Sequence, residues 1–269
     1  LMSFAAALSA FSYDRANAGA GRAIALLSFA TFWWSVCFIH EIDRFALEPH
    51  KLQIGMLWVG ATGVIAVGMM RVLPWPRLGG IGLAAVAAAP MLAFFVPVEQ
   101  PAPFVDGGAL AWFGYYAATF YALFRLRDRD GSLIGAAHAL WLLTLVVLLT
   151  WQANYSARVT LALDNGWVFA FTALPLALST WLLRERPRIA GAPLGESFLG
   201  YHNAVSLPPL LAIIVMAVLA CFEEGRAAPL PFVPVANPLE LIQITLGVLL
   251  WVFTRAIADG ATRTIARRG

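Results

Sequence analysis

The sequence predicts an all-α fold, a polytopic bundle of transmembrane helices. Three observations support this prediction: the composition, the length of the apolar runs, and the distribution of basic residues between the segments that connect them. Hydrophobic residues make up 61% of the 269 residues and charged residues 12%, against about 45–50% and 25% in soluble globular domains. A water-soluble core at this chain length cannot enclose that much apolar surface, so the soluble classes of protein are excluded.

Eight apolar runs are each close to the ~20 residues that a helix needs to cross the hydrocarbon core. A backbone in hydrocarbon must satisfy its own hydrogen bonds, and these runs are continuous rather than alternating, so they are helices and not barrel strands. The predicted spans cover residues 22–40, 53–70, 78–97, 108–126, 132–151, 165–183, 206–222 and 240–257. Short connections between them predict antiparallel neighbours.

The chain starts inside a shorter apolar run, Leu1 to Ser12. This run is too short to span the bilayer, and no basic segment precedes it as in a signal peptide. We interpret it as one partial N-terminal span whose beginning is missing. Residues 1–269 are then a single transmembrane helical domain, a fragment of a longer protein.

The basic residues divide unequally between the two sets of alternating connections. One side has four: Arg44, Lys51, Arg158 and Arg226. The other side has 14: Arg15, Arg22, Arg71, Arg77, Arg125, Arg127, Arg129, Arg184, Arg186, Arg188, Arg255, Arg263, Arg267 and Arg268. Because cytoplasmic connections carry the excess of Lys and Arg, we predict a plasma-membrane protein with a cytoplasmic C-terminus and with Arg44 on the outer side. The net charge of +3 is explained in the same way and gives no reason to expect nucleic acid as a partner.

Prolines and glycines within the predicted spans indicate bends of the helix and close contacts between helices. Pro90, Pro175 and the pair Pro208–Pro209 predict either ordinary kinks or helices that are broken around a site. Gly60–Gly63 and Gly79–Gly82 are small-residue faces that predict close packing between helices.

The first full span ends in a group of chemically capable side chains. If the helix continues, Trp33, Cys37, His40, Glu41 and Arg44 follow one another at spacings of three and four and share a face. His40, Glu41 and Arg44 could bind an anion, move a proton or catalyse a reaction at the outer side. The alternative is a solvated helix end with an internal ion pair.

A second candidate ligand-binding set follows the span that ends at residue 151. Trp151, Asn154, Tyr155 and Arg158 are predicted to converge with the first set on the outer side. Aromatic, amide and guanidinium groups suit a sugar or a lipid headgroup, and they are also the ordinary composition of an aromatic belt beside wet loops.

His138 is the one ionisable residue well inside a predicted span. It is a candidate functional group, or a neutral histidine bonded between helices. No Asp, Glu or Lys stands at mid-span beside it, which argues against an ion-coupled pump. Cys37 and Cys221 have no metal-type spacing. We expect them to be unpaired, and the alternative is a disulfide at the outer side. No metal site, cofactor or catalytic motif is predicted, and whether the protein is an enzyme stays open.

The stretch Pro229–Leu241 resembles a signature near the C-terminus of a large bacterial family of predicted many-spanning inner-membrane proteins of unknown function. In this family a P-L-P-Y-x-P-x-x-N-P-L-D-L run precedes the last membrane helices, and here Phe232 replaces the Tyr and Glu240 the Asp. The family's proteins are much longer, which agrees with a C-terminal portion. The resemblance implies no catalytic or ligand-binding residues.

The residues of this stretch also have a physical interpretation of their own. Prolines at 229, 231 and 234 predict an extended outer loop. Asn237 is then the N-cap of the last span, with Pro238 at its first position and Glu240 in its first turn.

Two functions remain. The leading hypothesis is a transporter-like or scaffold component of the cell envelope with an outward-facing polar vestibule near His40 and Arg44. The alternative is a membrane-embedded enzyme that modifies an envelope lipid or glycan at the periplasmic face. The expected partners are membrane lipids and either other envelope proteins or the missing N-terminal part.

Overall fold

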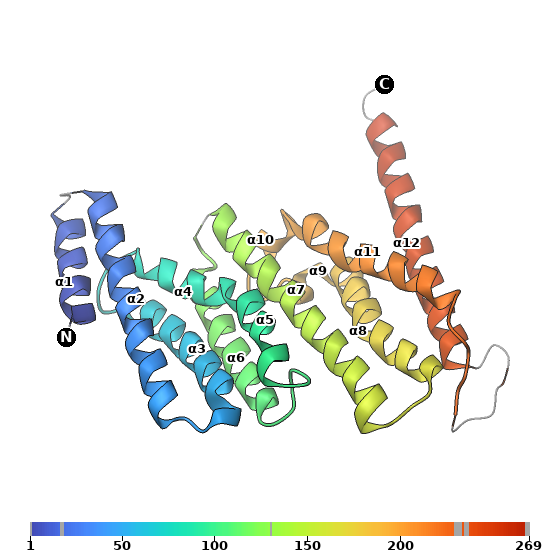
Figure 1. The fold of residues 1–269 in the computed structure, drawn as a ribbon. Coiled ribbons are helices and arrows are strands. Elements are labelled where there is room, and N and C mark those ends of the chain that lie inside the picture. Colours follow the sequence, from blue (N-terminus) through green and yellow to red (C-terminus); the bar gives the residue numbers. More distant parts are fainter. Residues whose placement is uncertain (1, 17–18, 130, 229–232, 234–236, 267–269) are drawn as a thin grey trace. The chain divides into compact units, whose positions relative to one another are not determined.

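The computed structural model describes residues 2–16, 19–129, 131–228, 233 and 237–266, with side chains up to Arg255. Every regular element within these residues is a helix and none is a strand, which confirms the predicted all-α class (Figure 1). The chain divides into two compact units, Leu1–Trp141 and Leu142–Gly269, which we call unit 1 and unit 2. They are described separately below, and the single domain stays a prediction.

Unit 1 is built around α6, which packs against both α3 and α4, while α1 and α2 form a hairpin (Figure 1). Its elements are α1 (Met2–Arg15), α2 (Ala20–Phe45), the 3-10 turn η1 (Glu48–His50), α3 (Lys51–Met69), α4 (Leu78–Ala87), α5 (Ala89–Glu99), α6 (Gly108–Leu126) and the first part of α7 (Ser132–Tyr155).

The predicted small-residue faces bring the helices of unit 1 into close contact. A Cβ atom built on Gly63 of α3 would lie 2.8 Å from the Cβ atom of Ala85 in α4. A Cβ atom built on Gly60, one turn earlier, would lie 3.0 Å from the Cβ atom of Ala118 in α6. Glycine therefore lets the backbone of α3 approach both neighbours, as the sequence predicts.

The predicted span at residues 78–97 is a bent pair of helices. The axes of α4 and α5 meet at 43°. Pro90 has no N–H group to give to the carbonyl of Val86 one turn earlier. The hydroxyl of Tyr115 in α6 reaches this carbonyl oxygen at 3.3 Å, while its shorter bond, at 2.7 Å, is to the carbonyl oxygen of Ala85. At Pro90 the structure therefore shows a sharp bend, which both alternatives predict, and a site around this bend stays a prediction.

This contact gives a first prediction. Tyr115→Phe leaves the ring in place and removes the donor to a buried carbonyl, so we expect the free energy of unfolding to fall by about 1–3 kcal/mol. Tyr121→Phe on the same helix is the matched control, because its hydroxyl has no bond among the described residues. Denaturation of the detergent-solubilised chain measures both, and equal losses would contradict the role of the Tyr115 hydroxyl.

Unit 2 contains three long helices that pack on one another, with α8 in contact with both α11 and α12. Its elements are the rest of α7, the π-helical turn η2 (Ser156–Thr160), α8 (Asn165–Glu185), α9 (Pro187–Ala190), α10 (Glu196–Leu199), α11 (His202–Ala220) and α12 (Pro238–Ala266). Phe169, Ala173 and Ala177 form an i, i+4 stripe on α8 that meets apolar side chains of α11 and α12 in the core.

Six described helices are long and apolar enough to cross a membrane, or seven if the bent pair α4–α5 counts as one span. They are α2, α3, α7 with η2, α8, α11 and the first part of α12. The predicted count of eight is not confirmed, because α6 lies outside this set. It has the length of a span, but Trp112, Tyr115, Tyr116 and Arg125 make it more polar.

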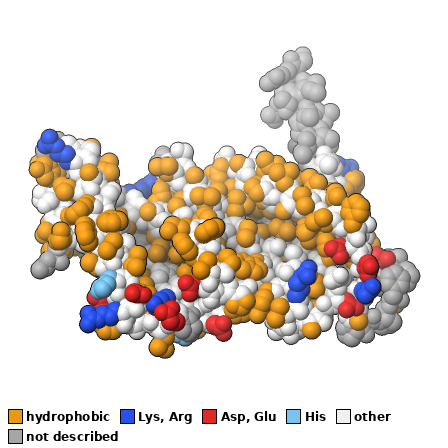
Figure 2. All heavy atoms as spheres, in the orientation of Figure 1, with side chains coloured by type: hydrophobic (Ala, Val, Ile, Leu, Met, Phe, Trp, Pro, Cys, Tyr) orange, Lys and Arg blue, Asp and Glu red, His pale blue; other side chains and the backbone are white. Residues whose placement is uncertain are grey.

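Large apolar side chains are exposed along the flanks of the candidate spans. On α2, the exposed residues include Phe29, Phe32 and Ile39. Figure 2 shows hydrophobic side chains on the helix flanks and charged ones near the helix ends. Exposed apolar flanks with polar ends are what helices in lipid require.

Candidate functional site

The first predicted ligand-binding set lies on the last turns of α2, which continues to Phe45. His40, Glu41 and Arg44 are all exposed. The ion pairs next to them are formed by Lys51, whose Nζ atom lies 2.8 Å from carboxylate oxygens of both Asp43 and Glu48. This geometry is that of a solvated helix end with an ion pair, and binding of a ligand there stays a prediction.

The second predicted set lies at the end of α7 in unit 2, whereas the first set lies in unit 1. Trp151, Asn154 and Tyr155 are half-buried, and Arg158 is exposed on the π-helical turn η2. The side-chain amide of Asn154 donates to the Thr172 hydroxyl of α8 at 2.8 Å. Asn154 therefore joins two helices of unit 2, and the predicted convergence of the two sets is not tested.

His138 is fully buried on the part of α7 that belongs to unit 1, with its ring stacked on Trp141 at a centroid distance of 5.8 Å. The indole N–H of Trp141 donates to the Thr119 hydroxyl at 2.9 Å, and the Tyr116 hydroxyl donates to the Trp141 carbonyl oxygen at 3.2 Å. These bonds connect α6 with α7 around His138.

Sequence reasoning singled out His138 and missed the residues around it. Tyr115 and Tyr116 are adjacent in α6, and Thr119 lies one turn after them. Such a cluster of hydroxyl groups on one face is a usable sign of interhelical hydrogen bonding.

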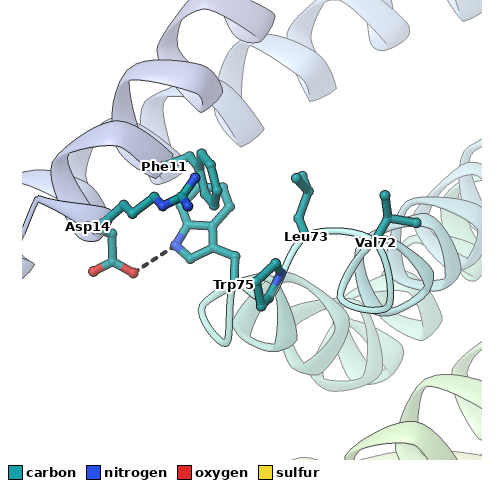
Figure 3. A pocket seen from close by; sticks show the side chains of 7 residues that line it. Phe11, Asp14, Val72, Leu73 and Trp75 are labelled. Carbon is teal, nitrogen blue, oxygen red and sulfur yellow. Dashed lines mark hydrogen bonds between the residues drawn. The ribbon is translucent and has the colours of Figure 1, made fainter.

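A pocket of about 400 Å³ lies between the end of α1 and the connection from α3 to α4 (Figure 3). We call it the α1 pocket, and its lining residues are Phe11, Asp14, Arg15, Val72, Leu73, Pro74 and Trp75. Sequence reasoning missed it, because its walls come from two segments that are some 60 residues apart in the chain.

The resemblance motif is partly described. Its prolines 229, 231 and 234 lie outside the described residues, and so does the predicted extended loop. Asn237 is the N-cap of α12 as predicted, because its Oδ1 atom accepts the backbone N–H of Leu239 at 2.8 Å. Its side-chain amide donates to the carbonyl oxygen of Gly225 at 2.8 Å, and the residue is only 2% exposed.

Three further hydrogen bonds connect the segment after α11 to the start of α8. The Gly166 N–H donates to the Arg226 carbonyl oxygen at 3.1 Å, and the Trp167 indole N–H donates to that of Ala227 at 3.1 Å. The Asp164 carboxylate accepts the backbone N–H of Ala228 at 3.0 Å. Asn237 thus belongs to a structural junction of α8, α11 and α12.

Two other groups of residues give no site. Cys37 and Cys221 are exposed free thiols. Within the described part of the chain, no cluster of three or more His, Cys, Asp or Glu side chains is placed to hold a metal ion.

Comparison with known proteins places the chain in a family. Neither the curated proteins nor the solved structures contain a match. A family model described as "Predicted membrane protein (DUF2339)" matches residues 2–268. This is a membrane protein family of unknown function, in agreement with the resemblance at Pro229–Leu241 and with the apolar helices. The chain therefore belongs to the DUF2339 family of predicted membrane proteins.

Proposed function

We propose that this chain is a scaffold component of the bacterial cell envelope, embedded in the inner membrane with its C-terminus in the cytoplasm. The observation that supports a scaffold is the use of polar groups inside unit 1. Trp141, Thr119 and Tyr116 bond α6 to α7, and Tyr115 bonds α6 to α4. These groups form hydrogen bonds between helices, whereas a transporter needs a hydrated polar pathway past His138.

The proposed orientation is supported by contacts within each unit. In unit 1, Arg77 before α4 pairs with Asp14 of α1 at 2.7 Å. At the same end, Arg129 after α6 donates to the carbonyl oxygen of Pro76 at 2.8 Å. In unit 2, Arg184 of α8 lies over the Phe253 ring of α12 at 5.7 Å. The arginine-rich connections of each unit thus gather at one end, the side that the positive-inside rule makes cytoplasmic.

Membrane lipids are the partners that this role requires. Other envelope proteins are the proposed further partners. The exposed apolar flanks of the helices are compatible with both kinds of contact.

Labelling of single cysteines with a membrane-impermeant maleimide tests both parts of the proposal. In a background with Cys37→Ser and Cys221→Ser, Leu47→Cys should react in intact spheroplasts, and Val72→Cys only after permeabilisation. Both native residues are exposed in connections between helices, at 73% and 82%. Thr119→Cys and His138→Cys should stay unlabelled in native membranes, because both positions are fully buried.

The reverse pattern at residues 47 and 72 would overturn the orientation alone. Labelling at residues 119 and 138 in native membranes would overturn the scaffold role in favour of a transporter. Reaction of all four cysteines after denaturation in SDS serves as the control for thiol reactivity and protein amount.

A further inference from the structure

The α1 pocket combines an aromatic wall with charged groups. Trp75 is buried, and the Phe11 ring meets it edge-on at a centroid distance of 5.5 Å. Leu73 packs against the same small core. Figure 3 shows Phe11 and Trp75 side by side, with Asp14 at the edge of the indole.

Asp14 is neutralised by donors of the protein itself. One carboxylate oxygen accepts the Trp75 indole N–H at 2.9 Å, and the other lies 2.7 Å from the Nε atom of Arg77. A carboxylate with both oxygens engaged in this way repels an incoming anion far less than a free one does.

Arg15 supplies a positive charge that Asp14 does not neutralise, because Asp14 is paired with Arg77. Arg15 lines the pocket, is exposed, and has no hydrogen-bond or ion-pair partner among the described residues. Arg22 lies in the first turn of α2 and Arg71 just after α3. Asp14 is the one acid in the segment 13–22 or the segment 70–77. The surroundings of the pocket are therefore cationic.

The location of the pocket points to lipid rather than to a solute. It lies where α1 and α3 end and α4 begins, so it lies at the border of the hydrocarbon layer. Val72 lines it and is 82% exposed, which gives its rim an aliphatic side chain at this border. Basic pockets between helix ends on the cytoplasmic side suit anionic lipid headgroups, and about 400 Å³ falls within the usual size of a ligand pocket.

We propose that the α1 pocket binds the headgroup of an anionic phospholipid. The guanidinium group of Arg15 holds the phosphate, and the glycerol and upper acyl carbons lie against Trp75, Leu73 and Val72. Asp14 and Arg77 hold the indole in place. This inference goes beyond the scaffold role, and it rests on the proposed orientation only in placing the pocket on the cytoplasmic side.

Native mass spectrometry of the detergent-purified chain, titrated with phosphatidylglycerol or phosphatidylcholine, tests the proposal. We expect one tightly retained phosphatidylglycerol and weaker retention of phosphatidylcholine. Arg15→Gln should weaken phosphatidylglycerol binding about fivefold, as the loss of one interfacial arginine implies. Arg15→Lys should restore most of it. Arg127→Gln is the matched control, an exposed arginine in another connection of the same arginine-rich end, and should leave binding unchanged.

Each other outcome would overturn the proposal. Equal weakening by Arg15→Gln and Arg127→Gln would mean diffuse attraction to charge. Equal retention of the two lipids, or none by the wild-type chain, would mean that no headgroup site exists. Displacement of phosphatidylglycerol by millimolar inorganic phosphate would make free phosphate the ligand. Thermal unfolding of each variant shows that the fold is intact, since residues 15 and 127 are both exposed.

Discussion

Gly63→Leu is expected to destabilise unit 1 by about 3 kcal/mol or more, at the upper end of what overpacking costs. A Cβ atom at this position would lie 2.8 Å from the Cβ atom of Ala85 and 3.9 Å from the backbone of Gly82. Both neighbours belong to α4, so no flexible side chain can move aside. The larger residue must push α3 away from α4, which also disturbs the bend that Tyr115 holds.

Gly68→Leu is the matched control, because it makes the same change on the same helix. A Cβ atom at Gly68 meets nothing within 4 Å, so we expect a change within about 0.5 kcal/mol. Unfolding of both variants by SDS in mixed micelles, followed by far-UV circular dichroism, measures the difference. If the two variants lost stability equally, the close contact between α3 and α4 would be refuted.

Asn237→Ala is expected to cost unit 2 about 2–4 kcal/mol, the sum of a lost N-cap and an unsatisfied buried carbonyl. The same side chain accepts the Leu239 N–H and donates to the Gly225 carbonyl oxygen. The substitution therefore removes the N-cap of α12 and leaves the Gly225 carbonyl oxygen without this donor.

Two further variants separate these contributions. Asn237→Ser keeps an oxygen for the cap and loses the amide donor to Gly225, so we expect an intermediate loss of stability. Asn203→Ala removes an exposed asparagine from the first turn of α11 and should change little. Thermal unfolding in detergent ranks the three, and an Asn237→Ala variant as stable as Asn203→Ala would contradict the junction.

Much of the fold could be predicted because lipid restricts the backbone to helices, so apolar runs translate directly into elements. The N-cap at Asn237 and the glycine faces at Gly60 and Gly63 were also predictable, since both depend on local chemistry. The number of membrane spans was harder to predict. A run such as α6 is helical in either case. It has the length of a span, but its aromatic and basic residues place it outside the candidate spans, so the length of an apolar run overestimates the number of spans.

The candidate sites were harder to predict because they depend on tertiary contacts. His40 and Arg44 are candidate ligand-binding residues by residue type alone, whereas the structure places them on an exposed helix end. The hydrogen bond between Asp14 and Trp75 joins residues 61 positions apart, and no local sequence pattern predicts it. Trp75 stands between two prolines in a short connection, where its composition indicates a turn, and its indole forms a wall of the α1 pocket.

The length of α7 has a consequence for the surrounding bilayer. With η2 it forms a stretch of 29 residues, against 19 in α3, or about 43 Å against about 29 Å at 1.5 Å per residue. A hydrocarbon layer of about 30 Å fits α3 without adjustment, and α7 must tilt or protrude. We expect the turns with Trp151 and Arg158 to be the ones that protrude, because their side chains suit the headgroup layer. A thicker membrane would draw these turns inward, so lipid chain length itself acts on this end of the molecule.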